Sequence, residues 1–357
     1  MDEFTAPPGG SPGSTLTPFP TRHGGMLVTS ILRRRTGVLL LAALLLAMIT
    51  AFAPNAAAAT YPNPEMISGA TYAHDPSMVK TASGRYYLFY TGGGIQISTS
   101  TDRVHWSSAG QALPGGATWA TAYGGWKDLW APDVSYHNGV YWLYYAVSSF
   151  GSNHSAIGLA TSTTAAPGSW TDHGLVYSSQ SGGNYNAIDP GLTVDSAGRW
   201  WLSFGSFWSG IKTIQIDPAT GKPLASDSTR YSIAQRPNPD AVEGAYVYPH
   251  GGYYYLFTSF DYCCRGSNST YRIMVARATN PTGPYVDENG VSATSGGGTQ
   301  ILGTHGYVIG PGGQTVMHDS DGDVLVYHYY NGNQGGAARL GLNHLSWSAD
   351  GWPTVVN

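Results

Sequence analysis

The chain has 357 residues, of which 11% are charged, 42% are hydrophobic and 13% are aromatic. Disorder is excluded because it requires high charge and few aromatic residues, and long surface helices are disfavoured because they need many Lys, Glu and Arg residues. The 48 Gly, 25 Tyr and 11 Trp residues and the net negative charge instead favour short strands joined by tight turns and make nucleic acid a poor partner.

The first segment of the chain has the features of an export leader. Three arginines at 33–35 precede the apolar run 38–53, and a run of alanines follows. This order is typical of a secretory signal peptide, and the apolar run is shorter than the roughly 20 residues that a membrane span needs. We therefore predict that residues 1–59 are a signal peptide with an upstream extension, removed or disordered. The remaining protein is then secreted and has no membrane contact; a transmembrane anchor is the alternative.

Five similar segments recur after this leader, each with a glycine before a run of aromatic and β-branched residues. The glycines are Gly84, Gly139, Gly198, Gly252 and Gly322. Repeats of this length that consist of strands are typical of a β-propeller, with one four-stranded sheet in each blade. We therefore expect an all-β, five-bladed propeller with antiparallel blades around a central channel, which forms a single catalytic domain over residues 60–357.

The same repeats place three acidic residues. Counting back nine residues from the glycines reaches Asp75, Asp189 and Glu243, and in the other two repeats Trp130 and Gly313. If the first strand of each blade lines the channel, these positions form a ring at one mouth. Like charges that share a cavity raise at least one pKa, which provides the protonated acid and the ionised base that hydrolysis uses. The alternative is that acidic residues begin strands by chance, but Glu243 is one of only three glutamates after residue 59.

The chain has two cysteines, and they are adjacent. Cys263 and Cys264 do not have the spacing of a zinc site. An exported protein can form disulfides, so the pair is either a vicinal disulfide or two packed thiols.

Several segments resemble glycoside hydrolase family 43. Four of them are Ala73-His-Asp-Pro-Ser77, Trp130-Ala-Pro-Asp133, Ala187-Ile-Asp-Pro-Gly191 and Val242-Glu-Gly-Ala-Tyr246. Within that family, Ser259-Phe-Asp-Tyr-Cys-Cys-Arg-Gly266 and Gly310-Pro-Gly-Gly-Gln314 are most similar to the endo-α-1,5-L-arabinanases. The resemblance covers about residues 60–357. It implies a five-bladed propeller that hydrolyses arabinan, a side chain of pectin, by an inverting mechanism, as a monomer without an organic cofactor.

The resemblance also implies a role for each acidic residue. Asp75 resembles the general base that activates water, and Glu243 resembles the general acid that protonates the leaving oxygen. Asp189 resembles the third carboxylate, which orients the substrate and raises the pKa of the acid. Inversion requires about 6.5–9.5 Å between base and acid, so that a water molecule fits.

Further residues are candidates for substrate binding. Trp130 occupies the ring position of the second repeat, and the resemblance implies that it stacks on a furanose, with Phe150 as a second platform. Ser206 and Phe207 follow the third repeat and are placed at the same cleft. Asn186 precedes Asp189 by three residues and orients substrate or only holds a turn. For the other aromatic residues, packing in a blade is the alternative.

The resemblance further implies a calcium-like ion in the channel near a histidine. Many relatives have Gly-Pro-Gly-His where this chain has Gly313 as the fourth residue, so His328 is the remaining candidate ligand. Calcium prefers oxygen ligands, so a site at His328 implies mostly water around the ion; a packed His328 is the alternative. The segment Asp319-Ser-Asp-Gly-Asp323 resembles half a calcium loop, but it lacks the distal Glu, and we interpret it as a hairpin turn.

Other functions remain open on the sequence alone. The same acids would serve an exo-acting α-L-arabinofuranosidase or β-xylosidase of the family, because loop lengths decide whether the cleft is open. A non-catalytic carbohydrate-binding propeller would not need a proton donor. A propeller that binds proteins would not need acidic residues in its channel. The short chain and the arabinanase-like segments favour the endo-acting enzyme.

Overall fold

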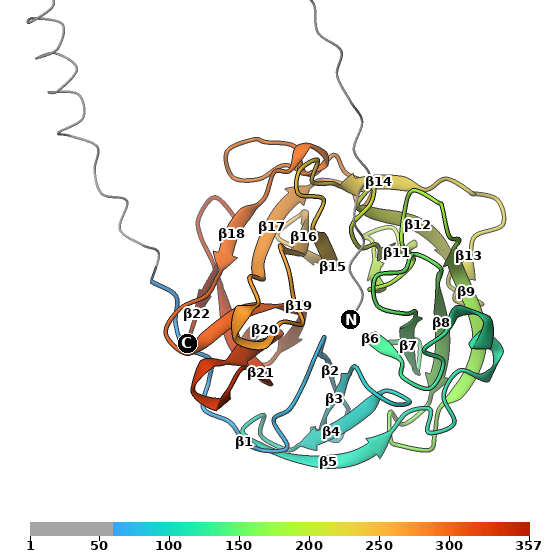
Figure 1. Cartoon of the computed structure of the whole chain (residues 1–357), viewed down its shortest axis with the longest axis horizontal. Coiled ribbons are helices and arrows are strands. Elements are labelled where there is room, and N and C mark those ends of the chain that lie inside the picture. The colour runs from blue at the N-terminus through green and yellow to red at the C-terminus, as the bar shows by residue number, and fades with distance from the viewer. Residues whose placement is uncertain (1–59) are drawn as a thin grey trace, which may run out of the picture. The chain divides into compact units, whose positions relative to one another are not determined.

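The structure of the protein is a computed structural model that describes residues 60–357. The predicted leader lies outside the described residues. Within residues 60–357 the strands form five sheets arranged in a ring, which confirms the expected five-bladed propeller (Figure 1). In this part of the chain, no helix is long and apolar enough to cross a membrane.

The blades follow one another in chain order (Figure 1). Blade 1 contains β2 (Ser77–Lys80), β3 (Tyr86–Tyr90), β4 (Gln96–Ser100) and β5 (His105–Gln111). Blade 2 contains β6 (Trp130–His137), β7 (Val140–Val147), β8 (Ser155–Ser162) and β9 (Thr171–Ser179). Blade 3 contains β10 (Gly191–Val194), β11 (Trp200–Phe204), β12 (Ile211–Asp217), β13 (Lys222–Pro223) and β14 (Tyr231–Ala234). Blade 4 contains β15 (Val242–His250), β16 (Tyr253–Phe260), β17 (Arg272–Ala278) and β18 (Thr299–Leu302). Blade 5 contains β19 (Val308–Asp319), β20 (Gly322–Asn331), β21 (Ala337–Trp347) and β22 (Pro353–Val356).

Two blades depart from the simple four-stranded pattern. In blade 1, the short strand β1 (Ser68–Gly69) adds to β5 in parallel orientation. In blade 3, the outer position is divided, because β13 and β14 both pair with β12. The other regular elements are short 3-10 helices: η1 (Thr118–Tyr123), η2 (Gly266–Asn268), η3 (Ala293–Ser295) and η4 (Gly332–Gln334).

The repeat glycines mark the turn between the first two strands of each blade. All five have a positive φ, from 78° at Gly198 to 130° at Gly322, a backbone conformation that other residues adopt only at a cost. The strand that follows each glycine is almost entirely buried, as in β11 and β20. This burial explains why these strands are continuous apolar and aromatic runs rather than alternating ones.

The first strands carry a second shared feature near the channel, and it corrects the predicted register. A residue with positive φ occupies this position in every blade: Asp75, Ala131, Asp189, Gly244 and Gly313. Asp75 and Asp189 are therefore equivalent to each other, but Glu243 lies one residue earlier, as does Trp130. The expectation of one common position was wrong because the turn between the first two strands differs in length. Five residues separate β2 from β3 and β10 from β11, but two separate β6 from β7 and β15 from β16, so the same count back from the glycine ends one residue earlier in blades 2 and 4.

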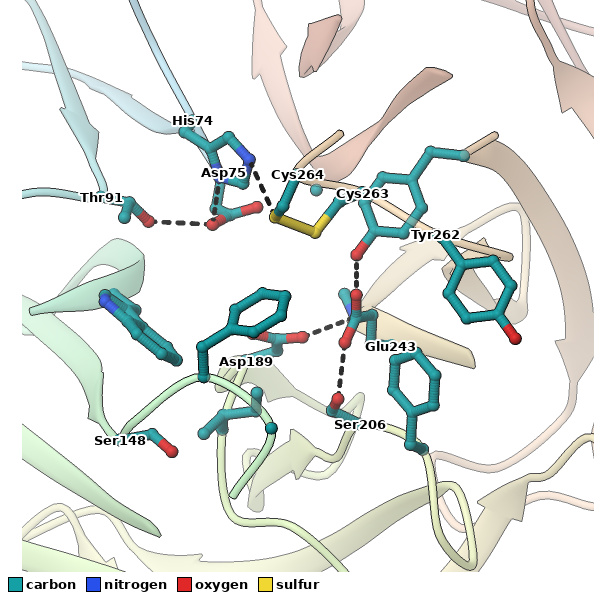
Figure 2. Close-up of a pocket in the computed structure, with 18 of the residues that line it drawn as sticks. His74, Asp75, Thr91, Ser148, Asp189, Ser206, Glu243, Tyr262, Cys263 and Cys264 are labelled. Atoms are coloured by element: carbon teal, nitrogen blue, oxygen red, sulfur yellow. Dashed lines mark hydrogen bonds and ion pairs between the residues drawn. A yellow bond between two sulfur atoms is a disulfide. The ribbon is translucent and has the colours of Figure 1, made fainter. Parts of the chain in front are cut away.

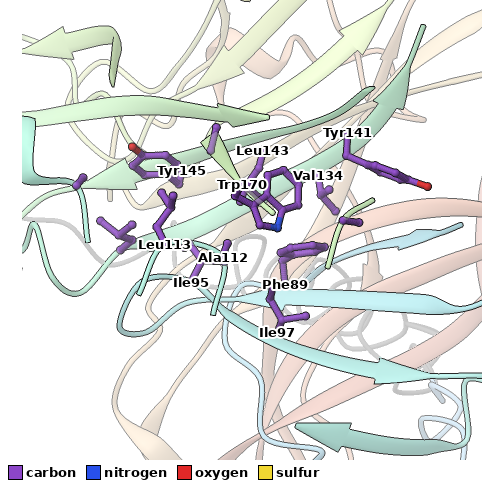
Figure 3. Packing of buried hydrophobic residues seen from close by; sticks show 14 of the residues in the cluster. Phe89, Ile95, Ile97, Ala112, Leu113, Val134, Tyr141, Leu143, Tyr145 and Trp170 are labelled. Atoms are coloured by element: carbon purple, nitrogen blue, oxygen red, sulfur yellow. The ribbon is translucent and has the colours of Figure 1, made fainter. Parts of the chain in front are cut away.

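The hydrophobic core lies between the blades. Within residues 60–357, the buried side chains form five clusters, and each cluster joins two neighbouring blades. Figure 3 shows the cluster between blades 1 and 2, where Phe89 and Trp170 meet edge to face with ring centroids 5.4 Å apart. Burial of one such large side chain contributes about 1.5–3 kcal/mol, so every blade depends on its two neighbours.

Charged residues join the first blade to the last. Arg103 of blade 1 donates to Asp319 at 2.8 Å and to Asp321 at 2.8 Å, beyond the end of β19. Lys80 and Tyr86 donate to the two oxygens of Asp319 at 2.6 and 2.5 Å. The segment 319–323 is the turn between β19 and β20, as we predicted, and its carboxylates face protein donors.

Candidate active site

The three predicted acids converge at one cavity. Asp75, Asp189 and Glu243 line a cavity of about 880 Å³, and Figure 2 shows their carboxylates directed into it. Asp75 precedes β2 and Asp189 precedes β10, both at the positive-φ position, and Glu243 lies at the start of β15. Blades 1, 3 and 4 therefore supply one acidic centre.

Asp75 is held as an ionised carboxylate. Its Oδ2 accepts hydrogen bonds from His74 Nδ1 at 2.7 Å and from Thr91 at 2.9 Å. Burial opposes ionisation, but the positive charge and hydrogen bond of His74 outweigh it and lower the pKa of Asp75 to about 2. The other oxygen, Oδ1, lies 3.5 Å from His328 Nδ1 and is the carboxylate oxygen with free capacity to accept a proton.

Asp189 and Glu243 have the opposite shift. Burial raises the pKa of both residues, and the charges of Glu243 and Asp75 raise that of Asp189 further. The amide of Gly244 donates to Asp189 Oδ2 at 2.9 Å, which favours the ionised form of Asp189. The site therefore combines one strongly acidic carboxyl group with two that hold a proton to higher pH, as acid–base hydrolysis requires.

Two hydroxyl groups hold the carboxylate of Glu243. Ser206 donates to Oε2 at 2.5 Å, and Tyr271 of blade 4 donates to Oε1. Both bonds lower the pKa of Glu243 against the larger effect of burial. Ser206, which we predicted to bind substrate, thus also contacts the acid. Tyr271 was missed, because nothing in its local sequence marks a residue that meets Glu243 through the fold.

The other predicted binding residues also line the cavity. Trp130, Phe150, Asn186 and Phe207 are all part of its wall. Phe150 is 83% exposed, which fits a surface platform and excludes core packing for this residue. The buried Asn186 accepts a hydrogen bond from Ser155 at 2.6 Å, so its side chain is partly used within the protein. None of these contacts tests binding itself, which stays a prediction.

Several residues at the cavity were not predicted as site residues. They are Tyr72, His74, Thr91, Trp208, Tyr262, the two cysteines, Arg265, Tyr271 and Tyr330. His74 had a signal, because it precedes Asp75 within a segment that resembles the family. Cys263 and Cys264 form a disulfide at the cavity (Figure 2), which decides between the two alternatives left by the sequence.

His328 is the predicted metal ligand, and its surroundings fit that role in part. Nδ1 accepts a hydrogen bond from the amide of Asp75 at 3.0 Å, and the ring stacks on His74 with centroids 3.9 Å apart. Nε2 is buried and has no hydrogen-bond partner among the described residues. Burial and the charge of His74 lower the pKa of His328 to about 3, so the ring is neutral, and because Nδ1 accepts the Asp75 amide, its proton is on Nε2.

Gly313 leaves room for this arrangement. A Cβ atom on Gly313 would lie 2.4 Å from Asp75 Oδ1 and 2.8 Å from His328 Nδ1. A side chain at position 313, including the histidine of many relatives, would therefore displace Asp75 or His328. Glycine in place of the histidine of many relatives is therefore consistent with the close packing of Asp75 and His328.

This packing makes Gly313→Ala a sensitive substitution. We expect kcat to fall by about 100-fold, since a displacement near 1 Å at a catalytic group has an effect of this size. Steady-state kinetics on a polysaccharide substrate tests this. Gly251→Ala is the matched control, because Gly251 has φ of 56° against 58° at Gly313 and open space around its Cβ. Equal activity of the two variants would contradict the assigned crowding.

Comparisons with known proteins agree with the geometry. Residues 65–353 match the family described as Glycosyl hydrolases family 43. The chain is 46% identical over 288 residues to the "Extracellular endo-alpha-(1->5)-L-arabinanase 1" of Bacillus subtilis (strain 168), with 79% of this chain and 87% of the relative covered. It is similar to the solved "GH43 Endo-Arabinanase from Bacillus licheniformis", with 46% identity, a TM-score of 0.76 and coverage of 81% of this chain and 99% of the other. An exo-1,5-α-L-arabinanase from a bovine ruminal metagenomic library has 37% identity, a TM-score of 0.77 and coverage of 82% and 100%.

Proposed function

The chain belongs to glycosyl hydrolase family 43, and from this premise we propose that it is a secreted endo-hydrolase of α-1,5-linked L-arabinan. The observation that carries the proposal is the convergence of Asp75, Asp189 and Glu243 on one aromatic-rimmed cavity. Relatives that are named endo-arabinanases and are 46% identical support the choice of substrate. The protein is a glycoside hydrolase; the polymer, the endo action and the roles of the residues are the proposal.

In the proposed mechanism, Asp75 is the general base. Its Oδ2 is occupied by His74 and Thr91, so Oδ1 takes the proton from the attacking water. The water attacks the anomeric carbon on the face opposite the leaving group, which inverts the configuration. The low pKa of Asp75 keeps the base ionised across the working pH range.

Glu243 is the general acid and donates its proton to the leaving oxygen. Burial raises its pKa, so that it retains a proton near neutral pH. Asp189 is the third carboxylate. Two charges in one buried pair are unfavourable, so Asp189 and Glu243 share a proton, and the proposed mechanism uses it from Glu243.

Removing the hydroxyl of Tyr271 tests the assignment of the acid. The bond from Tyr271 lowers the pKa of Glu243, so Tyr271→Phe raises it. The acid then stays protonated to higher pH, and we expect the alkaline limb of the kcat/KM profile to move upward, by about one pH unit for a bond to a charged group. Tyr285→Phe, at another buried tyrosine whose hydroxyl contacts only Pro281, is the control. An unchanged or downward-moved limb for Tyr271→Phe is inconsistent with the assignment.

Substrate binding is proposed for the aromatic and polar walls of the cavity. Trp130 and Phe150 offer flat apolar faces for furanose rings, and Phe207 lies on the wall beside Tyr262, with ring centroids 5.9 Å apart. Asn186 and Ser206 supply polar contacts close to the acids. Stacking on such faces suits a neutral polysaccharide, because it requires no charge.

The product pattern separates endo from exo action. We expect the protein to convert linear debranched arabinan into a ladder of oligosaccharides early in the reaction, resolved by anion-exchange chromatography. Release of arabinose alone, or of one short product from the chain end, would support the exo-acting alternative. Binding without hydrolysis would indicate a carbohydrate-binding propeller.

We also propose His328 as the protein ligand of a calcium-like ion. In its present contacts, Nδ1 accepts the Asp75 amide, which leaves the ring proton on Nε2. Ligation by Nε2 requires this proton on Nδ1, where Asp75 Oδ1 lies 3.5 Å away. Water would complete the coordination, and the ion would supply positive charge near the acids. We expect calcium to bind in calorimetric titrations of the protein and not of His328→Gln; equal binding by both would refute this site.

The remaining proposals concern the whole protein. We propose that residues 1–59 direct export and are then removed, and that the enzyme acts as a monomer. A relative named extracellular supports the first proposal. Mass spectrometry of the exported protein gives its first residue, and light scattering gives its mass in solution.

A further inference from the structure

A disulfide between adjacent residues lies at the wall of the catalytic cavity. Cys263 and Cys264 are joined in the loop that follows β16 (Figure 2). The loop is fixed by hydrogen bonds of its own, from Thr270 to the carbonyl of Tyr262 at 2.8 Å and from Arg265 to Ser269 at 3.0 Å. Hydrolysis by two carboxylates does not use a disulfide, so this bond needs a separate explanation.

Hydrogen bonds connect this disulfide to Asp75. The amide of Cys264 donates to the hydroxyl of Tyr330 at 2.7 Å. The same hydroxyl lies 2.9 Å from His74 Nε2, and His74 Nδ1 lies 2.7 Å from Asp75 Oδ2. The Tyr330 hydroxyl therefore joins the Cys264 amide to His74, and His74 joins Tyr330 to Asp75.

The backbone at Cys264 explains why a covalent bond is needed. Cys264 has φ of 67°, in the left-handed region that residues with a side chain rarely adopt. Such a conformation persists only where the surroundings enforce it. The bond to Cys263 closes a small ring around this backbone, and it thereby holds the Cys264 amide against Tyr330. Without the bond, the residue can return to a common conformation and withdraw its amide.

We propose that the Cys263–Cys264 disulfide is a positioning element for the base: it fixes Tyr330, and through Tyr330 and His74 it fixes the carboxylate of Asp75. This inference rests on the proposed role of Asp75. It assigns positioning roles to Cys263, Cys264, Tyr330 and His74, which act through Asp75.

Reduction of the disulfide is the first test. Dithiothreitol converts the bond into two thiols and is itself oxidised to its cyclic disulfide. The chain has two cysteines, and Cys264 is exposed, so the reagent acts only at this loop. We expect kcat on linear arabinan to fall by about 10- to 100-fold and to recover when oxidised glutathione replaces the reductant. The double variant Cys263→Ser/Cys264→Ser is the control, and its activity must not respond to reductant.

A double-mutant cycle separates this role from direct contact with substrate. Tyr330→Phe retains the ring but removes the hydroxyl that links Cys264 to His74. If the disulfide acts through Tyr330, reduction of Tyr330→Phe lowers kcat little further, because the connection is already broken. If reduction leaves kcat of the native protein unchanged, or if the two losses multiply, the proposal is overturned. Should the serine variant not fold, the reduced native protein and Tyr330→Phe still complete the test.

The same assay distinguishes failure of this inference from failure of the proposed function. Native protein that hydrolyses arabinan, together with inactive Asp75→Asn, supports the role of Asp75 whatever reduction does. If Asp75→Asn is active, Asp75 is not the general base, and the proposed positioning of Asp75 by the disulfide loses its premise.

Discussion

Replacement of Glu243 by Gln is expected to lower kcat on linear arabinan by about 10²–10⁴-fold, the usual contribution of a general acid. The amide has almost the same shape and can still accept a bond from Tyr271 or Ser206, so the fold should be retained. It cannot donate a proton to the leaving oxygen. Initial rates of reducing-end formation measure the loss, and circular dichroism confirms that the variant is folded.

An activated leaving group distinguishes the acid from the base. The aryloxide group of an aryl arabino-oligosaccharide departs without protonation by the enzyme, so Glu243→Gln should recover much of its activity on this substrate. Asp75→Asn should be equally impaired on both substrates, because water must still be activated. Near-normal turnover of arabinan by either variant would refute its assignment, and recovery of Asp75→Asn alone would reverse the two roles.

Loss of Arg103 should destabilise the whole propeller. The side chain of Arg103 is 10% exposed and that of Asp319 is 3% exposed, and their ion pair joins the first blade to the last. Within residues 60–357, no strand passes from one of these blades into the other, and side chains hold this junction together with backbone bonds from Glu65 to Leu342 and from Leu340 to Thr71. Arg103→Met removes the partner of the half-exposed Asp321 and one of three donors to the buried Asp319, which keeps Lys80 and Tyr86. Loss of such bonds to charged groups costs about 1.5–3 kcal/mol. We expect the midpoint of urea unfolding, followed by tryptophan fluorescence, to fall accordingly.

An ion pair with an exposed arginine supplies the control for this experiment. Arg199 pairs with Asp195 at 2.7 Å, but its side chain is 54% exposed. Arg199→Met should change the free energy of unfolding by about 0–1 kcal/mol. If Arg103→Met unfolds at the same urea concentration as Arg199→Met, the junction is held by other contacts.

The sequence predicted the architecture because each blade repeats a local signal. A glycine that permits positive φ and the buried aromatic strand after it, as at Gly139 and Gly198, are both visible in short segments. Stacking of such units leaves few arrangements other than a propeller. The same regularity brought Asp75 and Asp189 to equivalent positions, which the structure confirms.

The details of the site were less predictable, because they depend on contacts between residues that are distant in the sequence. The difference in turn length that shifts Glu243 by one residue becomes visible only when the strand pairing is known. The contacts of Tyr271 with Glu243 and of Tyr330 with His74 join residues 28 and 256 positions apart. The first depends on the folding of blade 4, and the second on the closure of the ring between blades 1 and 5. The absence of a side chain at Gly313 is explained only by the positions of Asp75 and His328 beside it in the structure.

The stereochemistry of the product tests the central account most directly. Proton NMR spectra recorded in the first minutes, before mutarotation, show which anomer of the new reducing end forms first. A base at Asp75 and an acid at Glu243 on opposite sides of the bond predict inversion, so the β-anomer should appear first from the α-linked substrate. Initial formation of the α-anomer would mean retention through a covalent intermediate, and it would contradict the roles proposed for both residues.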